Sequence, residues 1–288
     1  MRQFVIAVTM ILAATVAYAG DRESGWDRWS DDCSPRNFQF GDHGRDSVVS
    51  REELAGASSL RSLKVTAENG PISVRGGASA YGIVVCKAAK DESTLSQIHV
   101  TLRGNELSAD GPDSGDWTVG YRITVPHSAQ LDLRSTNGPI GMQDVDGRIS
   151  AHAKNGPVSL RNVTGDVDAV TTNGPISLSG GGGNVKAIAT NGPVSVRLEG
   201  GNWQGGSLEA STTNGPLSVK VPKGYATGVV IESDGRGPIS CNFDGCDDVR
   251  TSLRESRHGE PRRFELGTGP RNVHLSTSNG PLTIKEGE

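Results

Sequence analysis

The residues best placed for chemistry in this chain are two carboxylates, Asp166 and Asp168. They are two positions apart, so in an extended strand both side chains lie on the same face. Such a pair could act as general acid and base in polysaccharide cleavage, with Arg148 or Lys186 as the charged partner. The alternative, which we favour, is a solvated face of mixed charge. We therefore predict no catalytic residues and no enzymatic activity.

The six histidines do not form a recognisable metal site in the sequence. None of them has the His-x-x-x-His spacing or completes a zinc motif with glutamate. We therefore expect neither a metal ion nor a cofactor. The histidines are His43, His99, His127, His152, His258 and His274.

Residues 1–19 have the organisation of a secretory signal peptide. Arg2 forms a short basic start, an apolar run follows, and Ala17-Tyr18-Ala19 is a small-x-small cleavage site before Gly20. The alternative is an amino-terminal anchor helix, but the run is shorter than the roughly 20 apolar residues that span a bilayer. Glycine at position 20 also lacks the thiol that a lipid anchor would need. We expect an exported protein, in the periplasm or at the cell surface or outside the cell, with no transmembrane segment after cleavage.

The four cysteines are even in number, which in an exported chain favours disulfides over metal ligation. Four cysteines allow three pairings. Cys241 and Cys246 bracket Asn-Phe-Asp-Gly, a turn-forming sequence, so we favour a bridge between them and a second bridge between Cys33 and Cys86. The small loop would stabilise the fold by roughly 2 kcal/mol.

The charge balance excludes one class of partner. After signal cleavage the chain has 28 basic and 33 acidic residues, hence a net charge of −5. This excess of acid argues against nucleic acid as the main partner. An envelope polysaccharide or an envelope protein is the expected partner.

Two surface motifs could contact such a partner. A basic run could bind anionic envelope polymers, although interspersed Glu255 and Glu260 favour an ordinary solvated loop. A row of serines could meet a repetitive surface such as ice or a glycan, although small polar residues also simply suit an outward strand position. The basic residues are Arg250, Arg254, Arg257, His258, Arg262 and Arg263, and the serines are Ser159, Ser177, Ser195, Ser218 and Ser240.

The elements that carry these residues come from an internal repeat. Asn-Gly-Pro occurs seven times, each time before an aliphatic, small, aliphatic triplet, and three consecutive intervals are 18 residues long. Fixed-period repetition is typical of solenoids, whose units bury their apolar faces against one another. The corners are expected at Asn69-Gly70, Asn137-Gly138, Asn155-Gly156, Asn173-Gly174, Asn191-Gly192, Asn214-Gly215 and Asn279-Gly280, with a degenerate copy at Arg236.

One repeat, Asn155 to Thr172, contains two short stretches in which apolar and polar residues alternate. This pattern predicts two strands per repeat. Asn-Gly often marks a hairpin, but the proline that follows favours extended backbone and hence a corner into a new strand. We expect the asparagines of successive repeats to lie about 4.8 Å apart.

These patterns predict an all-β fold: a single-stranded β-solenoid, similar to a β-helix, with about 18 residues per coil. Irregular coils or a small sandwich are expected near the amino-terminal end. The predicted organisation is a signal peptide at 1–19, a capping segment at 20–59, and a solenoid at 60–288 with inserts near 76–120, 200–206 and 241–270.

The segment Tyr121 to Leu160 contains Val-Pro-x-x-x-x-Leu-x-Leu-x-Ser-x-Asn-Gly-Pro-Ile. This run and the closing segment Val273 to Ile284 resemble the bacterial β-strand-repeat adhesin-like family, a domain family of unknown function. The resemblance spans roughly Leu60 to Lys285, and the proline after glycine departs from the usual family motif. It implies a secreted or envelope β-solenoid without established catalysis.

We therefore predict a non-enzymatic exported protein that acts as an adhesin or as a scaffold or binding protein of the cell envelope. One alternative is a carbohydrate-active β-helix enzyme that uses Asp166 and Asp168. Another is a periplasmic sensor whose tryptophan-containing segment, with Trp26 and Trp29, contacts a membrane partner.

Overall fold

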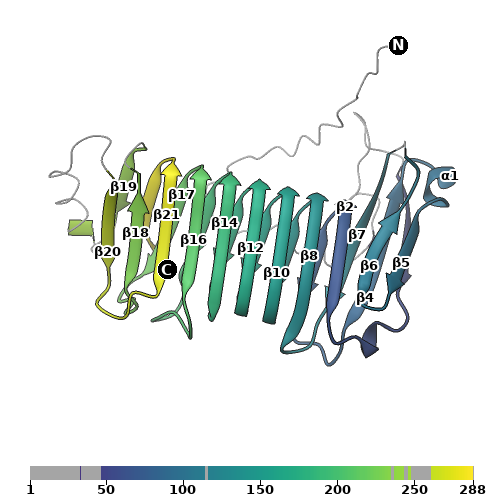
Figure 1. The fold of residues 1–288 in the computed structure, drawn as a ribbon, viewed down its shortest axis with the longest axis horizontal. Coiled ribbons are helices and arrows are strands. Elements are labelled where there is room, and N and C mark those ends of the chain that lie inside the picture. Colours follow the sequence, from purple (N-terminus) through teal and green to yellow (C-terminus); the bar gives the residue numbers. More distant parts are fainter. Residues whose placement is uncertain are drawn as a thin grey trace, which may run out of the picture.

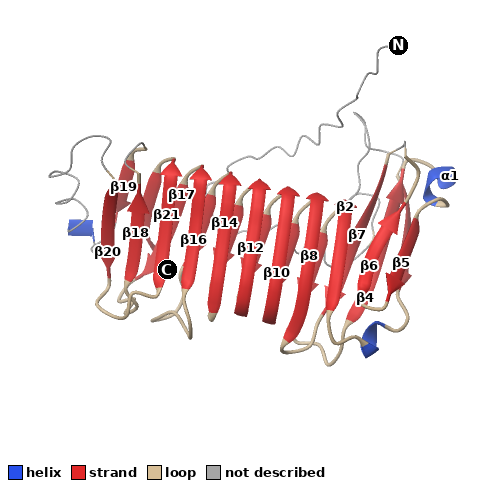
Figure 2. Ribbon diagram, in the orientation of Figure 1, coloured by secondary structure: helices blue, strands red, loops and turns tan. Residues whose placement is uncertain are grey.

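The computed structural model describes Cys33 and residues 47–113, 116–234, 237–242, 246–247 and 261–287. Two 11-stranded sheets, sheet A and sheet B, lie face to face, and their strands stack along the long axis of the molecule (Figure 1). Strands dominate the described chain, and the 3₁₀ turn η3 (Ala57–Ser59) and helix α1 (Glu92–Leu95) are short (Figure 2). The fold is therefore an all-β, sandwich-like pair of sheets.

Sheet B faces the viewer in Figure 1, with sheet A behind it. In spatial order, sheet A contains β1 (Val48–Glu53), β4 (Gly82–Ala89), β7 (Trp117–Thr124), β3 (Ile72–Arg75), β9 (Ile140–Gln143), β11 (Val158–Arg161), β13 (Ile176–Ser179), β15 (Val194–Arg197), β17 (Leu217–Pro222), β22 (Leu282–Gly287) and β19 (Ile239–Asn242). In spatial order, sheet B contains β20 (Arg262–Leu266), β18 (Val229–Ser233), β21 (Val273–Asn279), β16 (Leu208–Asn214), β14 (Asn184–Asn191), β12 (Thr164–Asn173), β10 (Asp146–Asn155), β8 (Ala129–Asn137), β2 (Leu63–Asn69), β6 (Glu106–Asp110) and β5 (His99–Arg103).

The prediction of a single-stranded solenoid is wrong. Both sheets are mixed: β1, β4 and β7 pair antiparallel in sheet A, as do β5 with β6 and β18 with β20 in sheet B. Strand order also departs from chain order, because β21 lies between β16 and β18, and β22 lies between β17 and β19. The physical reason is that alternation fixes which side chains point inward, but not which strand becomes the neighbour or in which direction it runs.

Within the regular block, the predicted strands and their register are confirmed. Each repeat gives one strand to each sheet, and β8, β10, β12, β14 and β16 pair in parallel. Successive corner asparagines are register partners, from Asn69 opposite Asn137 to Asn214 opposite Asn279. The repeats therefore stack with equivalent residues side by side.

The corner asparagines form a continuous row of side-chain hydrogen bonds. In six consecutive pairs, the Nδ2 of one asparagine donates to the Oδ1 of the asparagine in the neighbouring repeat, at 2.9–3.0 Å. Each interior member thus uses both its donor and its acceptor. This explains why asparagine recurs at this position.

The glycine after each asparagine is required by close packing of backbones. A Cβ at Gly174 would lie 2.6 Å from the carbonyl carbon of Gly156, and one at Gly156 would lie 2.7 Å from that of Gly138. Gly70 and Gly192 have φ values of +135° and +159°, whereas Gly156 and Gly174 do not have φ in this range. At Gly156 and Gly174 the glycine is therefore required because the next repeat leaves no room for a side chain.

The core lies between the two sheets. Large aliphatic side chains come from sheet A, where Ile140, Val158, Ile176 and Val194 are register neighbours and 0–1% exposed. Sheet B adds smaller side chains to the same core cluster, among them the fully buried Ala151, Ala169 and Ala187. The buried hydroxyl of Thr171 has a partner, because its Oγ1 donates to the Gly156 carbonyl oxygen at 3.0 Å, whereas the buried hydroxyls of Tyr121 and Tyr225 have none within the described part of the chain. The interior is filled, so the outward faces are the places to look for ligands.

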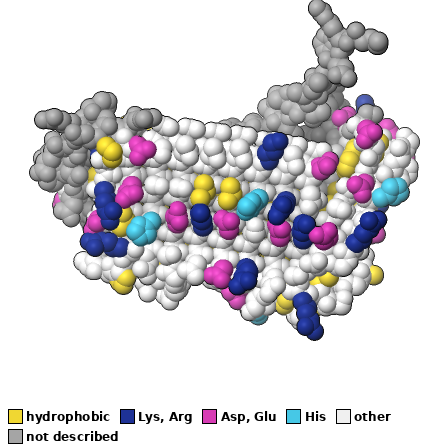
Figure 3. All heavy atoms as spheres, in the orientation of Figure 1, with side chains coloured by type: hydrophobic (Ala, Val, Ile, Leu, Met, Phe, Trp, Pro, Cys, Tyr) yellow, Lys and Arg dark blue, Asp and Glu magenta, His cyan; other side chains and the backbone are white. Residues whose placement is uncertain are grey.

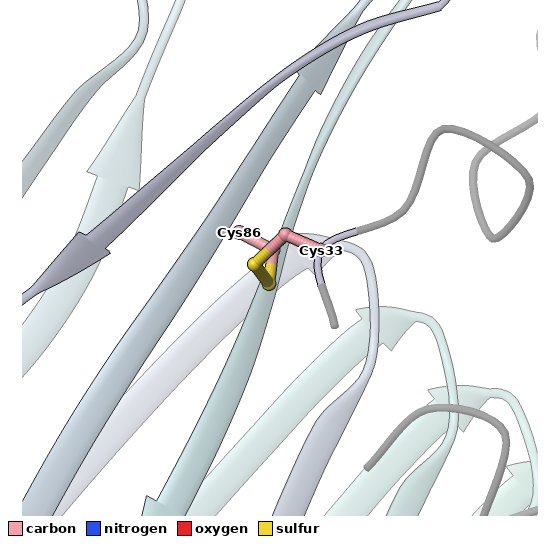
Figure 4. The surroundings of a disulfide bond; sticks show 2 residues. All are labelled: Cys33 and Cys86. Carbon is pink, nitrogen blue, oxygen red and sulfur yellow. A yellow bond between two sulfur atoms is a disulfide. The ribbon is translucent and has the colours of Figure 1, made fainter. Parts of the chain in front are cut away.

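Two disulfides join the cysteines in the pairing that the sequence favours. Cys33 is bonded to Cys86 on β4, with Cα atoms 5.4 Å apart (Figure 4). Cys241 is bonded to Cys246, with Cα atoms 5.7 Å apart. The first bridge ties the chain before β1 to the edge of sheet A, and the second closes a loop after β19.

Several predictions fall on parts of the chain outside the described residues. These are the signal peptide with Ala19 and Gly20, the tryptophans Trp26 and Trp29, and most of the basic run between Arg250 and His258. Of the predicted capping segment 20–59, the described part includes β1, which pairs antiparallel with β4 at the edge of sheet A. No helix within the described ranges is long and apolar enough to span a bilayer.

Candidate functional site

The outward face of sheet B carries a row of side chains of alternating charge, which we call the central row. Its members occupy equivalent positions on successive strands, so each lies about 4.8 Å from the next. Figure 3 shows acidic and basic side chains intermixed along the middle of this face. In spatial order the row contains Glu106, Lys64, Asp132, Ser150, Asp168, Lys186, Glu209 and His274.

Four members of the central row, Lys64, Asp132, Ser150 and Asp168, line an open groove of about 620 Å³. Strands β2, β8, β10, β12 and β14 supply most of its lining, and the side chains come from neighbouring outward positions. Its polar lining residues are Ser62, Lys64, Asn105, Gln130, Asp132, Arg148, Ser150, Asp166, Asp168 and Asn184. The groove therefore presents hydrogen-bond donors and acceptors along several consecutive strands.

The structure brings the sequence-predicted residues Arg148, Asp166 and Asp168 to this groove. Arg148 and Asp166 are register partners on β10 and β12, and their neighbours Ile149 and Val167 point into the core. The fourth predicted residue, Lys186, is the register partner of Asp168 on β14. Alternation along each strand is thus what turns these side chains outward.

The carboxylates of the groove are held by side chains of a neighbouring strand or, for Asp132, of the same strand. Asp166 Oδ1 accepts a hydrogen bond from Asn184 Nδ2 at 3.0 Å, and Asp168 Oδ2 lies 3.5 Å from His152 Nε2. Asp132 accepts two hydrogen bonds from Arg134, each at 3.1 Å. These contacts orient the oxygens while leaving lone pairs for a ligand.

Two charged groups on the same face have shifted pKa values. The hydrogen bonds that Arg134 donates to Asp132 raise the pKa of the Arg134 guanidinium above its ordinary value. Towards the β20 end, the hydrogen bond from Arg271 lowers the pKa of the Glu265 carboxyl. Both shifts favour the charged forms, so this face keeps its mixture of fixed charges near neutral pH.

This arrangement is suited to recognising a hydroxyl-rich ligand. Carboxylate oxygens accept hydrogen bonds from sugar hydroxyls, while Arg148, Lys64 and Asn184 can donate to their oxygens. General acid–base catalysis by two carboxylates requires surroundings that give the two carboxyl groups different pKa values. Asp166 and Asp168 instead stand on the same exposed face of one strand, and the side chain of Asp168 is 51% exposed.

The other sequence candidates lie elsewhere. The serines Ser159, Ser177, Ser195 and Ser218 are consecutive register partners on the outward face of sheet A. From the basic run, Arg263 on β20 forms ion pairs with Glu232 at 3.1 Å and with Glu265 at 3.3 Å.

Sequence reasoning missed Lys64 and Asp132, which extend the groove across β2 and β8. The signal was present, because each lies five residues before a corner asparagine, at the same offset as Asp168. The irregular spacing of these two copies hid the equivalence. Register pairing of Lys64 with Asp132 reveals it.

The sequence matches no protein-family model and none of the curated proteins. Among solved structures, the chain matches a candidate cell adhesion protein from Clostridium sporogenes at 13% identity and a TM-score of 0.29, and the match covers 83% of this chain and 100% of that chain. A candidate adhesin from Bacteroides fragilis has 12% identity and a TM-score of 0.38, and the match covers 83% of this chain and 97% of that chain. A candidate lipid-binding protein from Parabacteroides distasonis has 13% identity and a TM-score of 0.28, also covering 83% and 97%. Likeness at this level identifies no ligand, so the function must be argued from the surfaces.

Proposed function

We propose that this protein is a non-catalytic, exported binding protein of the cell envelope that holds a neutral polysaccharide along the groove of sheet B. The observation that supports this proposal is the groove itself, in which five neighbouring strands present alternating donors and acceptors. A polymer with hydroxyls repeated along its length can use such a row many times. Many weak contacts in line then give useful affinity without a deep pocket.

Export is supported by two features of the chain. The first 19 residues have the composition of a signal peptide, and both cysteine pairs are disulfide-bonded. Disulfides persist in the oxidising environment outside the cytosol. We place the protein in the periplasm or on the cell surface, where it would act as an adhesin or as an envelope scaffold.

Removing the groove carboxylates is expected to weaken binding of neutral polysaccharides by about tenfold. The double variant Asp166→Ala, Asp168→Ala loses two charged acceptors on an exposed face, where each contact contributes somewhat less than about 1 kcal/mol, so the two together amount to about 1.4 kcal/mol. Affinity would be measured on an array of neutral envelope and plant polysaccharides, with the best ligand followed by titration.

A matched control removes the same charge away from the groove. Glu53→Ala, Glu286→Ala is that variant, because these exposed or half-exposed residues lie on β1 and at the end of β22. It should bind as wild type does. The proposal is contradicted if the wild type releases sugar fragments and both single variants, Asp166→Ala and Asp168→Ala, lose this activity. That result would identify the protein as an enzyme.

A further inference from the structure

The outward face of sheet A has a chemistry different from that of sheet B. One row consists of hydroxyl side chains interrupted by Gly141, and we call it the hydroxyl row. Two residues further along each strand runs a second row, which we call the basic row. The hydroxyl row contains Ser73, Ser159, Ser177, Ser195, Ser218, Thr283 and Ser240; the basic row contains Arg75, Gln143, Arg161, Ser179, Arg197, Lys220, Lys285 and Asn242.

The alternation of each strand turns both rows outward. On β11, Val158 and Leu160 are 0% and 2% exposed and face the core, whereas Ser159 and Arg161 point to the other side. The same pattern holds on β15, where Val194 and Val196 are buried. Parallel pairing in register then carries each row across the sheet.

The basic row is cationic along most of its length. Arg75, Arg161 and Arg197 stand on every second strand, about 9.6 Å apart, and Lys220 and Lys285 follow on consecutive strands at about 4.8 Å. No acidic residue occupies an outward position of either row on the seven strands from β3 to β22. Five cations in one line create a positive potential that favours an anionic partner.

Nearby carboxylates do not neutralise the centre of this row. Asp144 and Glu199 lie in turns beside it, where Asp144 accepts hydrogen bonds from Gln143 and Asn162 and Glu199 accepts one from Ser179 at 2.6 Å. Among the described residues, no carboxylate lies within ion-pairing distance of Arg161, Arg197 or Lys220. These three cations therefore remain available to a ligand.

We propose that sheet A binds a linear polysaccharide bearing carboxylate groups, laid across the strands along the long axis of the molecule. The carboxylates pair with the basic row, while sugar hydroxyls form hydrogen bonds with the hydroxyl row about 7 Å away. One feature favours a polysaccharide over a nucleic acid: the outward positions of these strands contain no aromatic side chain on which a base could stack. This surface and its ligand class differ from those of the groove on sheet B.

The test compares two triple variants that remove the same charge from different surfaces. The first variant, Arg161→Ser, Arg197→Ser, Lys220→Ser, removes three positive charges from the centre of the basic row. The second variant, Arg51→Ser, Lys90→Ser, Arg103→Ser, removes two arginines and one lysine at exposed positions outside both rows of sheet A and outside the groove of sheet B. Binding to polygalacturonate would be titrated at low salt, with far-ultraviolet circular dichroism and melting curves to confirm that each variant is folded.

The first triple variant should lose at least about tenfold in affinity and the second less than about threefold, since only the first removes contacts with the polymer. Raising salt should also weaken wild type more than the first variant, because fewer counterions are displaced once the row is removed. Equal losses in the two variants would overturn the proposal, as would the absence of wild-type binding at low salt. Tighter binding to a DNA oligonucleotide than to polygalacturonate would overturn the choice of a carbohydrate. If the protein does not bind neutral polysaccharides, only the proposal for the groove of sheet B is contradicted. The two proposals can therefore be tested independently.

Discussion

Replacing Gly174 with valine should lower the free energy of unfolding by about 4 kcal/mol or more, because no side chain fits between successive corners. A Cβ at this position would lie 2.6 Å from the carbonyl carbon of Gly156, closer still to its oxygen, and 3.1 Å from Thr171 Oγ1. The nearest atoms are backbone, so relief requires the two repeats to separate. Their separation would stretch the hydrogen bonds on both sides of the corner. Equilibrium unfolding in urea measures the change.

Two controls separate this clash from the general effect of substitution. Gly201→Val adds the same side chain at an exposed glycine whose Cβ would meet no atom within 4 Å, and whose φ is not positive. Ser177→Ala trims an exposed hydroxyl on the adjacent strand of sheet A. Both should change stability by less than about 0.5 kcal/mol. Equal stabilities for Gly174→Val and these controls would mean that the corners are not closely stacked.

Loss of the Cys33–Cys86 bridge should cost about 4 kcal/mol, against about 2 kcal/mol for Cys241–Cys246. The first bridge joins residues 53 positions apart and the second joins residues 5 apart, so the first restricts the unfolded chain far more. The measurement is urea unfolding of the double serine variants of each pair. A larger loss from the short bridge would indicate that native contacts, and not loop closure, determine these contributions.

The strands of the regular block could be predicted because the same local pattern recurs at a constant interval. Residues six, four and two before each corner asparagine are apolar or small, as in Leu131, Leu133 and Ser135, and this offset also locates β2 and β21 outside the block. Side-chain alternation therefore gave the inward face of each strand correctly.

The all-β class was predicted correctly, but the arrangement of the strands into two mixed sheets could not be predicted in the same way. Arg262–Leu266 alternates as the repeats do and Val229–Ser233 begins with three buried apolar residues, yet the two strands pair antiparallel and β18 joins the sheet beside β21. The sequence of a short strand does not determine its direction or its neighbour in the sheet. Both depend on how the chain between two strands brings them together. The assumption that each repeat follows the last in space failed where the intervals became long.

Candidate surfaces were predictable only where the repeats were compared position by position. That comparison placed Arg148, Asp166 and Asn184 together, and the structure pairs them on adjacent strands. The basic row was missed because Arg75, Arg161 and Arg197 each look like an ordinary polar residue ending a strand. Their alignment exists only across repeats, and the intervening Gln143 and Ser179 obscure it in the sequence.

Both binding proposals depend on outward residues of distant repeats lying in straight rows across one sheet. Spin-label distances from Ser73→Cys to Ser177→Cys, Ser195→Cys or Ser218→Cys test this directly, because these labels stand on β3, β13, β15 and β17. The distance should increase by about 4.8 Å with each further strand, reaching about 24 Å between the Cα atoms of residues 73 and 218. Distances that fail to rise in this order would contradict the stacking of the repeats and, with it, both surfaces.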